Sequence, residues 1–274
     1  MSISIVLVTF LFQLSVGMVA TVSILPTQLI DKRFFRSITF WATLFTILGL
    51  VFKYYSTFSF PAASFIKESQ ILYYVFVFLM FQLWARIQFW DVSVSKKELL
   101  LITMVGLVAL TLESLMYRPD VSPIWTQNFL LPLNFISAAL LLGGFLAGMI
   151  FGHYYLVTTE MPKRLLVTMA LILIVVLVFR ILAVGATLIL YKEIIRPDGN
   201  FLLALTSFQG HGIFFWERVL VGLFIPAIVV VLIWSTARIG SNQSATGIMY
   251  VAIAFVFIGE LVARYLFLLS GIPL

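Results

Sequence analysis

Ionisable side chains lie inside several long apolar stretches of this sequence, where each of them opposes burial in a membrane. Three are arginines and two are glutamates: Arg180, Arg218, Arg264, Glu217 and Glu260. A charge at the middle of a membrane helix costs about 2.5–3.5 kcal/mol even on the lenient insertion scale, so each one needs a partner. Glu260 and Arg264 lie four residues apart in "FIGELVARYLFLL" and can pair along one helix face. A carboxylate beside guanidinium groups can also accept protons, and this is the chemistry that the set could support.

The composition of the chain identifies an integral membrane protein. Of its 274 residues, 62% are hydrophobic and only 10% are charged, whereas a soluble domain carries about 25% charged residues. The absence of cysteine excludes disulfides, cysteine-ligated iron–sulfur clusters and thiolate chemistry within the chain. The formal net charge of +6 is explained by membrane topology and does not indicate nucleic-acid binding.

Eight stretches are long and apolar enough for helices that cross about 30 Å of hydrocarbon. We expect an all-α bundle of about eight transmembrane helices in one domain, residues 1–274, because continuous apolar runs fit helices better than alternating strands. The expected spans are about 3–25, 35–57, 69–90, 98–117, 130–154, 164–191, 212–236 and 245–270. The first stretch lacks a basic start and a clear cleavage site, so we expect a retained span and not a signal peptide.

Basic residues in the loops predict the orientation. Nine follow the odd-numbered spans: Lys32, Arg33, Arg36, Arg86, Lys96, Lys97, Lys163, Arg164 and Arg238. Five lie on the other side: Lys53, Lys67, Arg118, Lys192 and Arg196. The positive-inside rule puts the nine in the cytoplasm and both termini outside, as in a multi-pass protein of the cytoplasmic (inner) membrane.

The polar groups of the spans share one level. At a rise of 1.5 Å per residue, Arg180, Arg218 and Glu260 lie roughly 8–16 Å below the outer end, as do Gln13, Glu217 and Arg264. Glu113 and His211 lie nearer the outer surface, and the inner half is almost wholly apolar. Such charges can simply tie helices together. A mostly apolar pocket with a few converging polar groups is, however, typical of a ligand site.

The two histidines argue against a bound haem. His153 in "FGHYYLV" and His211 fall at opposite membrane surfaces, so they cannot ligate one iron, and we expect no haem and no metal. His153 fits an interfacial aromatic belt. A lipid-soluble quinone suits the chain better, because its tail needs apolar walls and its head group needs a few polar partners. Glu217, Glu260 and His211 could accept protons from a quinol.

Two backbone features concern helix packing. Gly144, Gly148 and Gly152 recur every four residues and would let a neighbouring backbone approach closely. Pro226, inside the seventh span, frees a main-chain carbonyl and should bend that helix.

Three short segments carry a family resemblance: "FQLSVGM" (12–18), "FFWERVLVGL" (214–223) and "GELVAR" (259–264). They are similar to a Gln-x-x-x-Gly segment, a Trp-Arg-containing seventh span and a Gly-Glu-Leu-x-x-Arg motif. The sequence thus resembles membrane-anchor subunits of the dimethyl sulfoxide reductase type, within the polysulfide reductase and NrfD-like group. The eight-span plan and the outward N-terminus agree with this group.

The resemblance implies an anchor without a resident cofactor, which exchanges electrons between a quinone pool, expected to be menaquinone, and a docked ferredoxin-like iron–sulfur subunit. A molybdenum-containing catalytic subunit would complete the complex on the outer face. The positions that match polar residues of the family motifs are Gln13, Arg218, Glu260 and Arg264. The combined candidate quinone and proton site is Gln13, Lys53, Arg180, His211, Glu217, Arg218, Glu260 and Arg264.

Two departures from the family pattern leave alternatives open. Lys53 in "FKYYSTFSFP" stands near the place of a family histidine, and Gln70 in "SQIL" replaces an expected glutamate, with Glu68 two residues earlier. A purely structural anchor that binds no quinone is therefore a second reading. A small-solute or proton transporter is a third, although the inner half offers no matching polar groups and no inverted repeat is evident.

Overall fold

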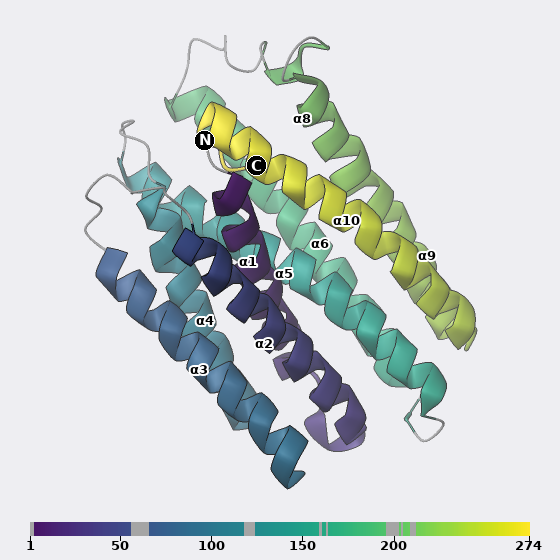
Figure 1. Cartoon of the computed structure of the whole chain (residues 1–274). Coiled ribbons are helices and arrows are strands. Elements are labelled where there is room, and N and C mark those ends of the chain that lie inside the picture. Colours follow the sequence, from purple (N-terminus) through teal and green to yellow (C-terminus); the bar gives the residue numbers. More distant parts are fainter. Residues whose placement is uncertain are drawn as a thin grey trace.

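The computed structural model describes residues 3–55, 66–117, 124–158, 161–162, 164–195, 203, 205–208 and 212–274, and these residues form helices without any strand. The long helices pack into one bundle (Figure 1). They are α1 (Ile3–Ile24), α2 (Lys32–Tyr55), α3 (Ile66–Trp90), α4 (Lys96–Met116), α5 (Ile124–Val157), α6 (Arg164–Leu190), α8 (Gly212–Val219), α9 (Ile225–Arg238) and α10 (Asn242–Ser270). Short helical turns η1 (Thr27–Leu29), η2 (Tyr191–Ile195) and η3 (Leu220–Phe224) complete the set. Eight helical segments of the described chain have the length and composition of membrane spans, which confirms the expected multi-pass all-α protein.

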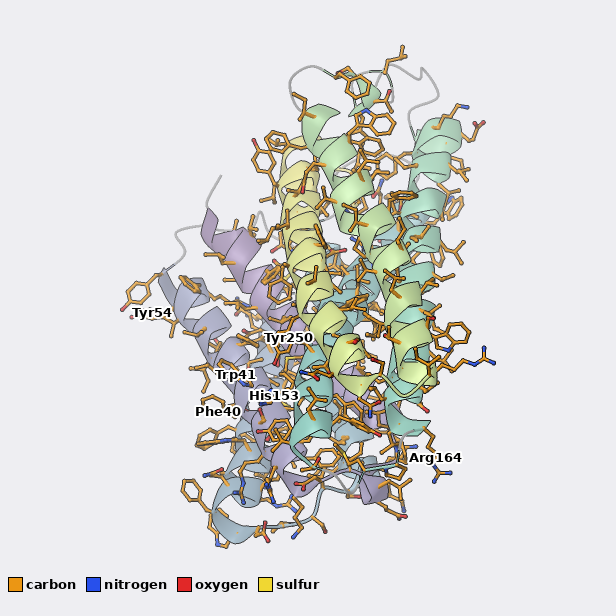
Figure 2. All side chains as sticks on the ribbon, turned by 90° about the vertical axis from the view of Figure 1, so that its right-hand side faces the viewer. Phe40, Trp41, Tyr54, His153, Arg164 and Tyr250 are labelled. Carbon is orange, nitrogen blue, oxygen red and sulfur yellow. The ribbon has the colours of Figure 1, made fainter. Side chains whose placement is uncertain are left out.

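The exterior of the bundle is strongly apolar. On α2, the side chains of Phe40, Trp41 and Tyr54 point away from the neighbouring helices (Figure 2), with exposed fractions of 42%, 40% and 84%. Large hydrophobic side chains are exposed in the same way along α3, α6 and α9. A soluble monomer rarely exposes apolar surface this continuously, so these side chains form the belt that lipid covers.

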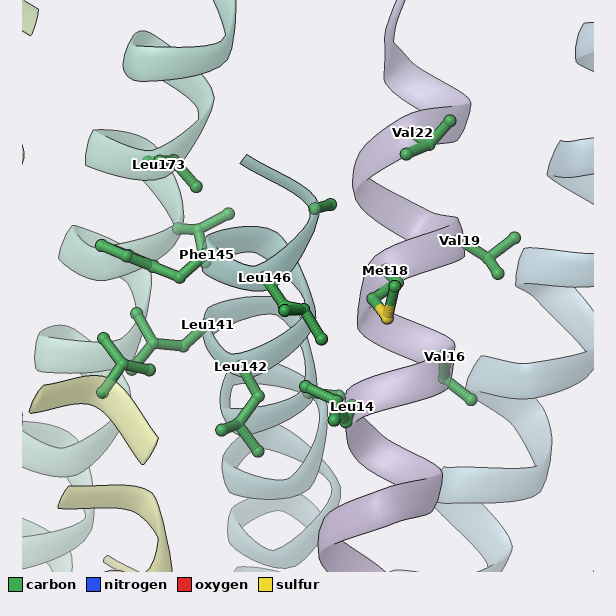
Figure 3. Close-up of a cluster of buried hydrophobic side chains, with 14 of the residues drawn as sticks. Leu14, Val16, Met18, Val19, Val22, Leu141, Leu142, Phe145, Leu146 and Leu173 are labelled. Carbon is green, nitrogen blue, oxygen red and sulfur yellow. The ribbon is translucent and has the colours of Figure 1, made fainter. Parts of the chain in front are cut away.

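Helices α1 and α5 form the centre of the bundle. Within the apolar windows of both spans 83% of residues are buried, compared with 28% in α3 and in the span that contains α8 and α9. Leu14 and Met18 of α1 belong to one apolar cluster with Leu142 and Phe145 of α5 (Figure 3). Because the backbones meet at Gly17 and Gly143, even a methyl group at either position would clash with main-chain atoms of the other helix.

The predicted glycine stripe of α5 faces side chains and not a neighbouring backbone. A methyl group at Gly148 would lie 3.0 Å from Leu173 of α6, and one at Gly152 would lie 2.9 Å from the hydroxyl of Thr246 on α10. The third member, Gly144, faces Thr21 and Leu173. The close approach of backbones occurs instead at Gly143, one position before the stripe, because that face of α5 is turned toward α1.

Helix α5 begins six residues before the expected start of the fifth span, at Ile124 and not at 130. This first turn contains the polar residues Thr126 and Gln127, and both are fully buried. The hydroxyl of Tyr191 donates to Oε1 of Gln127 at 3.2 Å. A polar side chain that finds such a partner is tolerated inside a bundle, and local hydropathy does not reveal the partner.

The seventh span is interrupted just before Pro226. Helix α8 gives way to a π-helical turn over Leu220–Phe224, and α9 begins at Ile225. Proline has no N–H to donate to the carbonyl four residues earlier, here that of Gly222, and local π geometry is a common way to absorb this loss.

The last residues of the chain turn back into the bundle. Gly271 ends α10 with a φ of 72°, a left-handed conformation that glycine adopts at little cost. Ile272 and Leu274 are then buried, with exposed fractions of 2% and 3%. The beginning of α1 lies near this tail, so we call this the termini end of the bundle (Figure 1). Which side of the membrane it faces stays a prediction.

Candidate functional site

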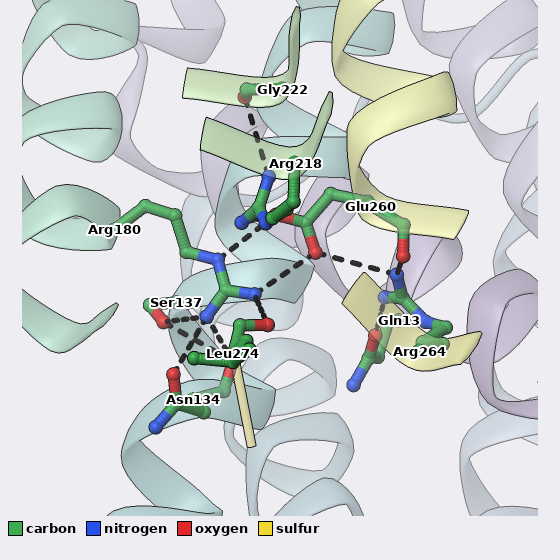
Figure 4. Close-up of polar contacts among 9 residues, drawn as sticks. All are labelled: Gln13, Asn134, Ser137, Arg180, Arg218, Gly222, Glu260, Arg264 and Leu274. Atoms are coloured by element: carbon green, nitrogen blue, oxygen red, sulfur yellow. Dashed lines mark hydrogen bonds and ion pairs between the residues drawn. The ribbon is translucent and has the colours of Figure 1, made fainter. Parts of the chain in front are cut away.

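Glu260 of α10 is the centre of a buried ionic cluster that receives three guanidinium groups (Figure 4). Arg180 of α6 contacts both carboxylate oxygens, with Nε 2.9 Å from Oε1 and Nη2 3.2 Å from Oε2. Arg218 of α8 donates to Oε1 at 2.7 Å. Nη1 of Arg264, one helical turn further along α10, lies 3.3 Å from Oε2, so the pairing predicted from the four-residue spacing is confirmed. Helices α6, α8 and α10 are therefore joined through one carboxylate.

Arg180 has a hydrogen-bond acceptor for each side of its guanidinium group. Beyond Glu260, its Nη1 donates to Oδ1 of Asn134 at 2.9 Å and to Oγ of Ser137 at 3.2 Å, both on α5. Its Nη2 donates to the main-chain oxygen of Leu274 at 2.7 Å. Arg180 is only 1% exposed. A buried guanidinium with all its donors engaged fixes the geometry around it.

Arg218 uses the carbonyl that Pro226 leaves without a donor. Its Nη1 donates to the main-chain oxygen of Gly222 at 3.3 Å. At the same level the backbones of α10 and the π turn meet, since a methyl group at Gly222 would lie 2.6 Å from Cα of Gly259. Gly259 precedes Glu260 directly, so this glycine contact brings Arg218 within reach of the carboxylate.

Arg264 connects the cluster to α1. Its Nη2 donates to Oε1 of Gln13 and its Nη1 donates to the main-chain oxygen of Glu260. The guanidinium also lies 5.2 Å from the ring centroid of Phe10, within cation–π range. The Nε of Arg264 is buried and has no hydrogen-bond acceptor among the described residues.

A cavity borders this cluster at the termini end. It encloses about 440 Å³ of empty space, part of it open to the exterior, and the centre of a water molecule can occupy about 40 Å³ of it. Its polar lining consists of Thr9, Gln13, Tyr117, Asn134, Arg180, Glu260 and Arg264. Its apolar lining consists of Ile5, Val6, Phe135, Ala138, Ala263, Phe267, Leu268, Pro273 and Leu274. A lining that combines polar and apolar groups is typical of a site for an amphipathic ligand.

The structure joins five of the eight candidate residues through hydrogen bonds: Gln13, Arg180, Arg218, Glu260 and Arg264. Lys53 and Glu217 are not part of this network. Lys53 lies at the end of α2, with Nζ 5.1 Å from the ring centroid of Tyr73. Glu217 is partly buried, and both of its carboxylate oxygens lack a hydrogen-bond partner among the described residues. His211 lies outside the described residues.

Sequence reasoning missed the acceptors and hydroxyl groups around the arginines. These groups belong to short polar residues, Asn134, Ser137 and Thr187. Residues of these types are common in membrane helices, so a single one does not indicate a functional site. The amide of Asn134 donates to Thr187 at 2.7 Å while its oxygen accepts from Arg180. The available signal was that "PLNFIS" places both Asn134 and Ser137, three residues apart, on one face of an apolar helix.

A second group of polar residues lies near the end of α4, and two of its members, Thr9 and Tyr117, line the cavity. The hydroxyls of Thr9 and Tyr117 lie 3.2 Å apart, and Glu113 stands one turn before Tyr117 on the same helix. Glu113 is 7% exposed and its Oε2 has no partner among the described residues. The described residues contain no group of three or more His, Cys, Asp or Glu side chains that could hold a metal ion.

The cluster thus provides a desolvated carboxylate fixed by cations, next to a cavity lined by amide, hydroxyl and guanidinium groups. Comparison with models of protein families, with curated proteins and with solved structures finds no match to this chain. Its chemistry must therefore be inferred from the side chains themselves. They can donate hydrogen bonds to a carbonyl or an anion and can accept protons near the membrane surface.

Proposed function

We propose that this protein is the membrane-anchor subunit of a multi-subunit oxidoreductase and exchanges electrons between the quinone pool and a docked iron–sulfur subunit. The observation that carries the proposal is the cavity beside the Arg–Glu cluster, whose lining combines hydrogen-bond donors with apolar residues. It lies at the end of the bundle that the distribution of basic residues predicts to face outward.

The side chains around the cavity fit the head group of a quinone such as menaquinone. A quinone carbonyl oxygen needs a donor, and Arg264 and Gln13 offer guanidinium and amide nitrogens on the cavity wall. The ring would lie against Phe135 and Phe267, which pack edge to face on each other with ring centroids 6.1 Å apart, and the isoprenoid tail would leave past Ile5 and Leu268 toward lipid.

Oxidation of a quinol releases two electrons and two protons, and the protons need a route from the cavity to the aqueous phase. Tyr117 and Thr9 carry hydroxyls on the cavity wall, and Glu113 of α4 lies one turn before Tyr117. The electrons would pass to an iron–sulfur cluster of the docked subunit, and the molybdenum-containing subunit would carry out catalysis. Reduction of a quinone would reverse each transfer.

The proposal is tested by filling the cavity without touching a charge. Ala263 of α10 lines the cavity and is 2% exposed, so Ala263→Leu should block a head group. Ala254→Leu is the matched control, because Ala254 is an exposed residue of the same helix. Both variants are purified with their native partners, and quinone in the lipid extract is measured by mass spectrometry. Near-stoichiometric quinone with the wild type and the control, and loss of at least about tenfold with Ala263→Leu, supports the proposal. Equal quinone in all three contradicts it.

A purely structural anchor is the second candidate, and one observation favours it. Glu260 accepts hydrogen bonds from three arginines and is 0% exposed, which is the arrangement expected of a tie between helices. On this account the chain would assemble with its partners and carry no quinone. Intact assembly with quinone absent from the wild-type extract would favour this candidate.

A further inference from the structure

A basic depression lies in the surface of the bundle at the end opposite the cavity, where the start of α2 meets the end of α3. It contains about 830 Å³ of space, which includes open solvent. Its lining consists of Ile30, Asp31, Lys32, Arg33, Arg36 and Asp91. The side chains of its three cations, in chain order, are 57%, 67% and 43% exposed. A ligand from outside the chain can therefore reach all three.

Two carboxylates position the three cations of the basic depression. Nζ of Lys32 donates to Oδ2 of Asp91 at 3.0 Å, and Nη2 of Arg36 lies 3.6 Å from Oδ1 of the same residue. Nε of Arg33 lies 3.8 Å from Oδ1 of Asp31. Ion pairs as exposed as these contribute little to stability, because water solvates both partners. A phosphate group can therefore compete with the carboxylates for the same cations.

The whole of this end of the bundle carries an excess of positive charge. Among the described residues of its loops and of the two helical turns next to them, eight are basic and three are acidic. The basic residues are Lys32, Arg33, Arg36, Arg86, Lys96, Lys97, Arg164 and Arg238, and the acidic ones are Asp31, Asp91 and Glu98. The positive-inside rule predicts that this end faces the cytoplasm, and the cytoplasmic leaflet is the one that is rich in anionic lipid.

Aromatic side chains continue from the basic depression into the lipid-facing surface. On α2, Phe40 follows the last arginine of the depression by one helical turn, and Phe40 and Trp41 both point away from the bundle (Figure 2). The ring of Trp84 on α3 lies 6.2 Å from that of Phe40 and 6.1 Å from that of Phe89, measured between centroids. Phe89 and Trp90 are each 69% exposed. Aromatic residues beside basic ones are typical of the level where lipid headgroups meet acyl chains.

We propose that the basic depression binds the headgroup of an anionic phospholipid, whose acyl chains lie along the aromatic surface of α2 and α3. Arg33 and Arg36 offer paired N–H donors to the phosphate oxygens, and Lys32 adds a third cation. A zwitterionic headgroup would bring a cation of its own next to these residues and should bind less well. The site lies far from the cavity, so it does not depend on the proposed role in quinone chemistry.

Native mass spectrometry of the purified full chain, stripped of lipid and held in detergent, tests the proposal. The probes are dioleoyl phosphatidylglycerol and dioleoyl phosphatidylcholine, which share their chains and differ in headgroup charge. A basic residue near a membrane surface strengthens the binding of anionic lipid about fivefold, so the first phosphatidylglycerol should bind at least about tenfold more tightly than the first phosphatidylcholine. Equal affinity for the two lipids overturns the proposal.

A pair of double variants locates the preference in the basic depression. Arg33→Gln/Arg36→Gln should lose most of the preference for phosphatidylglycerol, about fivefold for each arginine. Arg164→Gln/Arg238→Gln is the matched control, because it removes two exposed arginines from the same end of the bundle but outside the depression. The control should keep the preference. An equal loss in both double variants would indicate a general attraction to the basic end and overturns the site.

Asp91→Asn tests the same site by a gain of binding, which a poorly folded variant could not produce. It removes the carboxylate that competes with phosphate for Lys32 and Arg36. Phosphatidylglycerol should then bind about two- to fivefold more tightly, and phosphatidylcholine should be unaffected. Unchanged or weaker binding of phosphatidylglycerol overturns the proposal.

Soluble glycerol phosphate separates a lipid site from a site for free phosphate. It carries the phosphate of the headgroup without the acyl chains, so a large excess should displace little of the bound phosphatidylglycerol. Full displacement by glycerol phosphate overturns the assignment to lipid.

Discussion

The two ends of the bundle both pair arginine with carboxylates, but in opposite surroundings. At the termini end Glu260 is 0% exposed and holds three arginines. At the other end Asp91 is 65% exposed and contacts Lys32 at 3.0 Å and Arg36 at 3.6 Å. Water and salt weaken the exposed pairs to about 0–1 kcal/mol each, whereas removal of one partner from a buried pair costs about 3–5 kcal/mol.

The contrast shows what each set of charges can do. The exposed pairs lie among the basic residues from which the membrane orientation was predicted, and they can rearrange at little cost. The buried cluster ties helices α1, α5, α6, α8 and α10 to one carboxylate, through bonds that water cannot replace. A ligand site needs such fixed donors, so the cavity lies where the geometry is most strongly determined.

The largest effect is expected from Arg180→Met. It leaves Glu260 with two arginine partners and removes the hydrogen bonds that Arg180 donates to Asn134 and Ser137. We expect a loss of about 3–5 kcal/mol in the free energy of unfolding, measured by titration with sodium dodecyl sulfate in mixed micelles. The double variant Arg180→Met/Glu260→Gln should recover part of this loss, because no carboxylate is then stranded. If the free energy of unfolding of Arg180→Met lies within about 1 kcal/mol of the wild-type value, the buried cluster contributes no more than the exposed pairs.

A smaller effect is expected from Gly259→Ala. The added methyl group would meet the backbone of Gly222, and separating α10 from the π turn should cost about 1–3 kcal/mol and weaken the bond between Arg218 and Glu260. Gly247→Ala on the same helix is the control, since nothing lies within 4 Å of its added methyl group. Equal unfolding free energies for the two variants would contradict the close contact.

Asn134→Leu should cost less again, about 1–2 kcal/mol, because Nη1 of Arg180 loses Oδ1 but keeps the main-chain oxygen of residue 134 and Oγ of Ser137. Ser137→Ala removes only the longer, 3.2 Å contact with Arg180 and should cost about 1 kcal/mol or less. The same unfolding titration ranks the two variants. A larger loss for Ser137→Ala would contradict the arrangement of acceptors.

The smallest effect is expected at the exposed end. Asp91 has a φ of 49°, which asparagine also tolerates, so Asp91→Asn removes only the charge. The free energy of unfolding should change by no more than about 0.5 kcal/mol, and high salt should erase the difference. A loss comparable to that of Arg180→Met would show that the two ends do not differ as described.

Much of the fold could be predicted from the sequence, because membrane spans are recognised by length and apolar composition. The pairing of Glu260 with Arg264 was also predictable, since four-residue spacing is a local property. The position of Arg180 against the same carboxylate was not, because the two residues lie 80 positions apart and no local rule joins them. The start of α5 and the contact of Gly17 with Gly143 were missed for the same reason: both depend on which helix lies opposite.

Lys53 and Glu217 illustrate the limit of reasoning from depth alone. Glu217 was assigned to the candidate site because of its depth in the membrane, and Lys53 because of its place in the family pattern. Rotation about the helix axis decides whether a side chain faces the cluster, and adjacent residues such as Glu217 and Arg218 point about 100° apart. Arg218 reaches Glu260, and Glu217 does not.

The most direct test of the central claim is an electron cryo-microscopy map of the complex purified in native lipid, examined in the cavity between Gln13, Arg264 and Phe267. The proposed quinone site predicts flat density for a quinone ring, with one carbonyl within hydrogen-bond distance of Arg264 or Gln13 and a tail that leads to lipid. A well-resolved cavity that contains only side chains and water would contradict it.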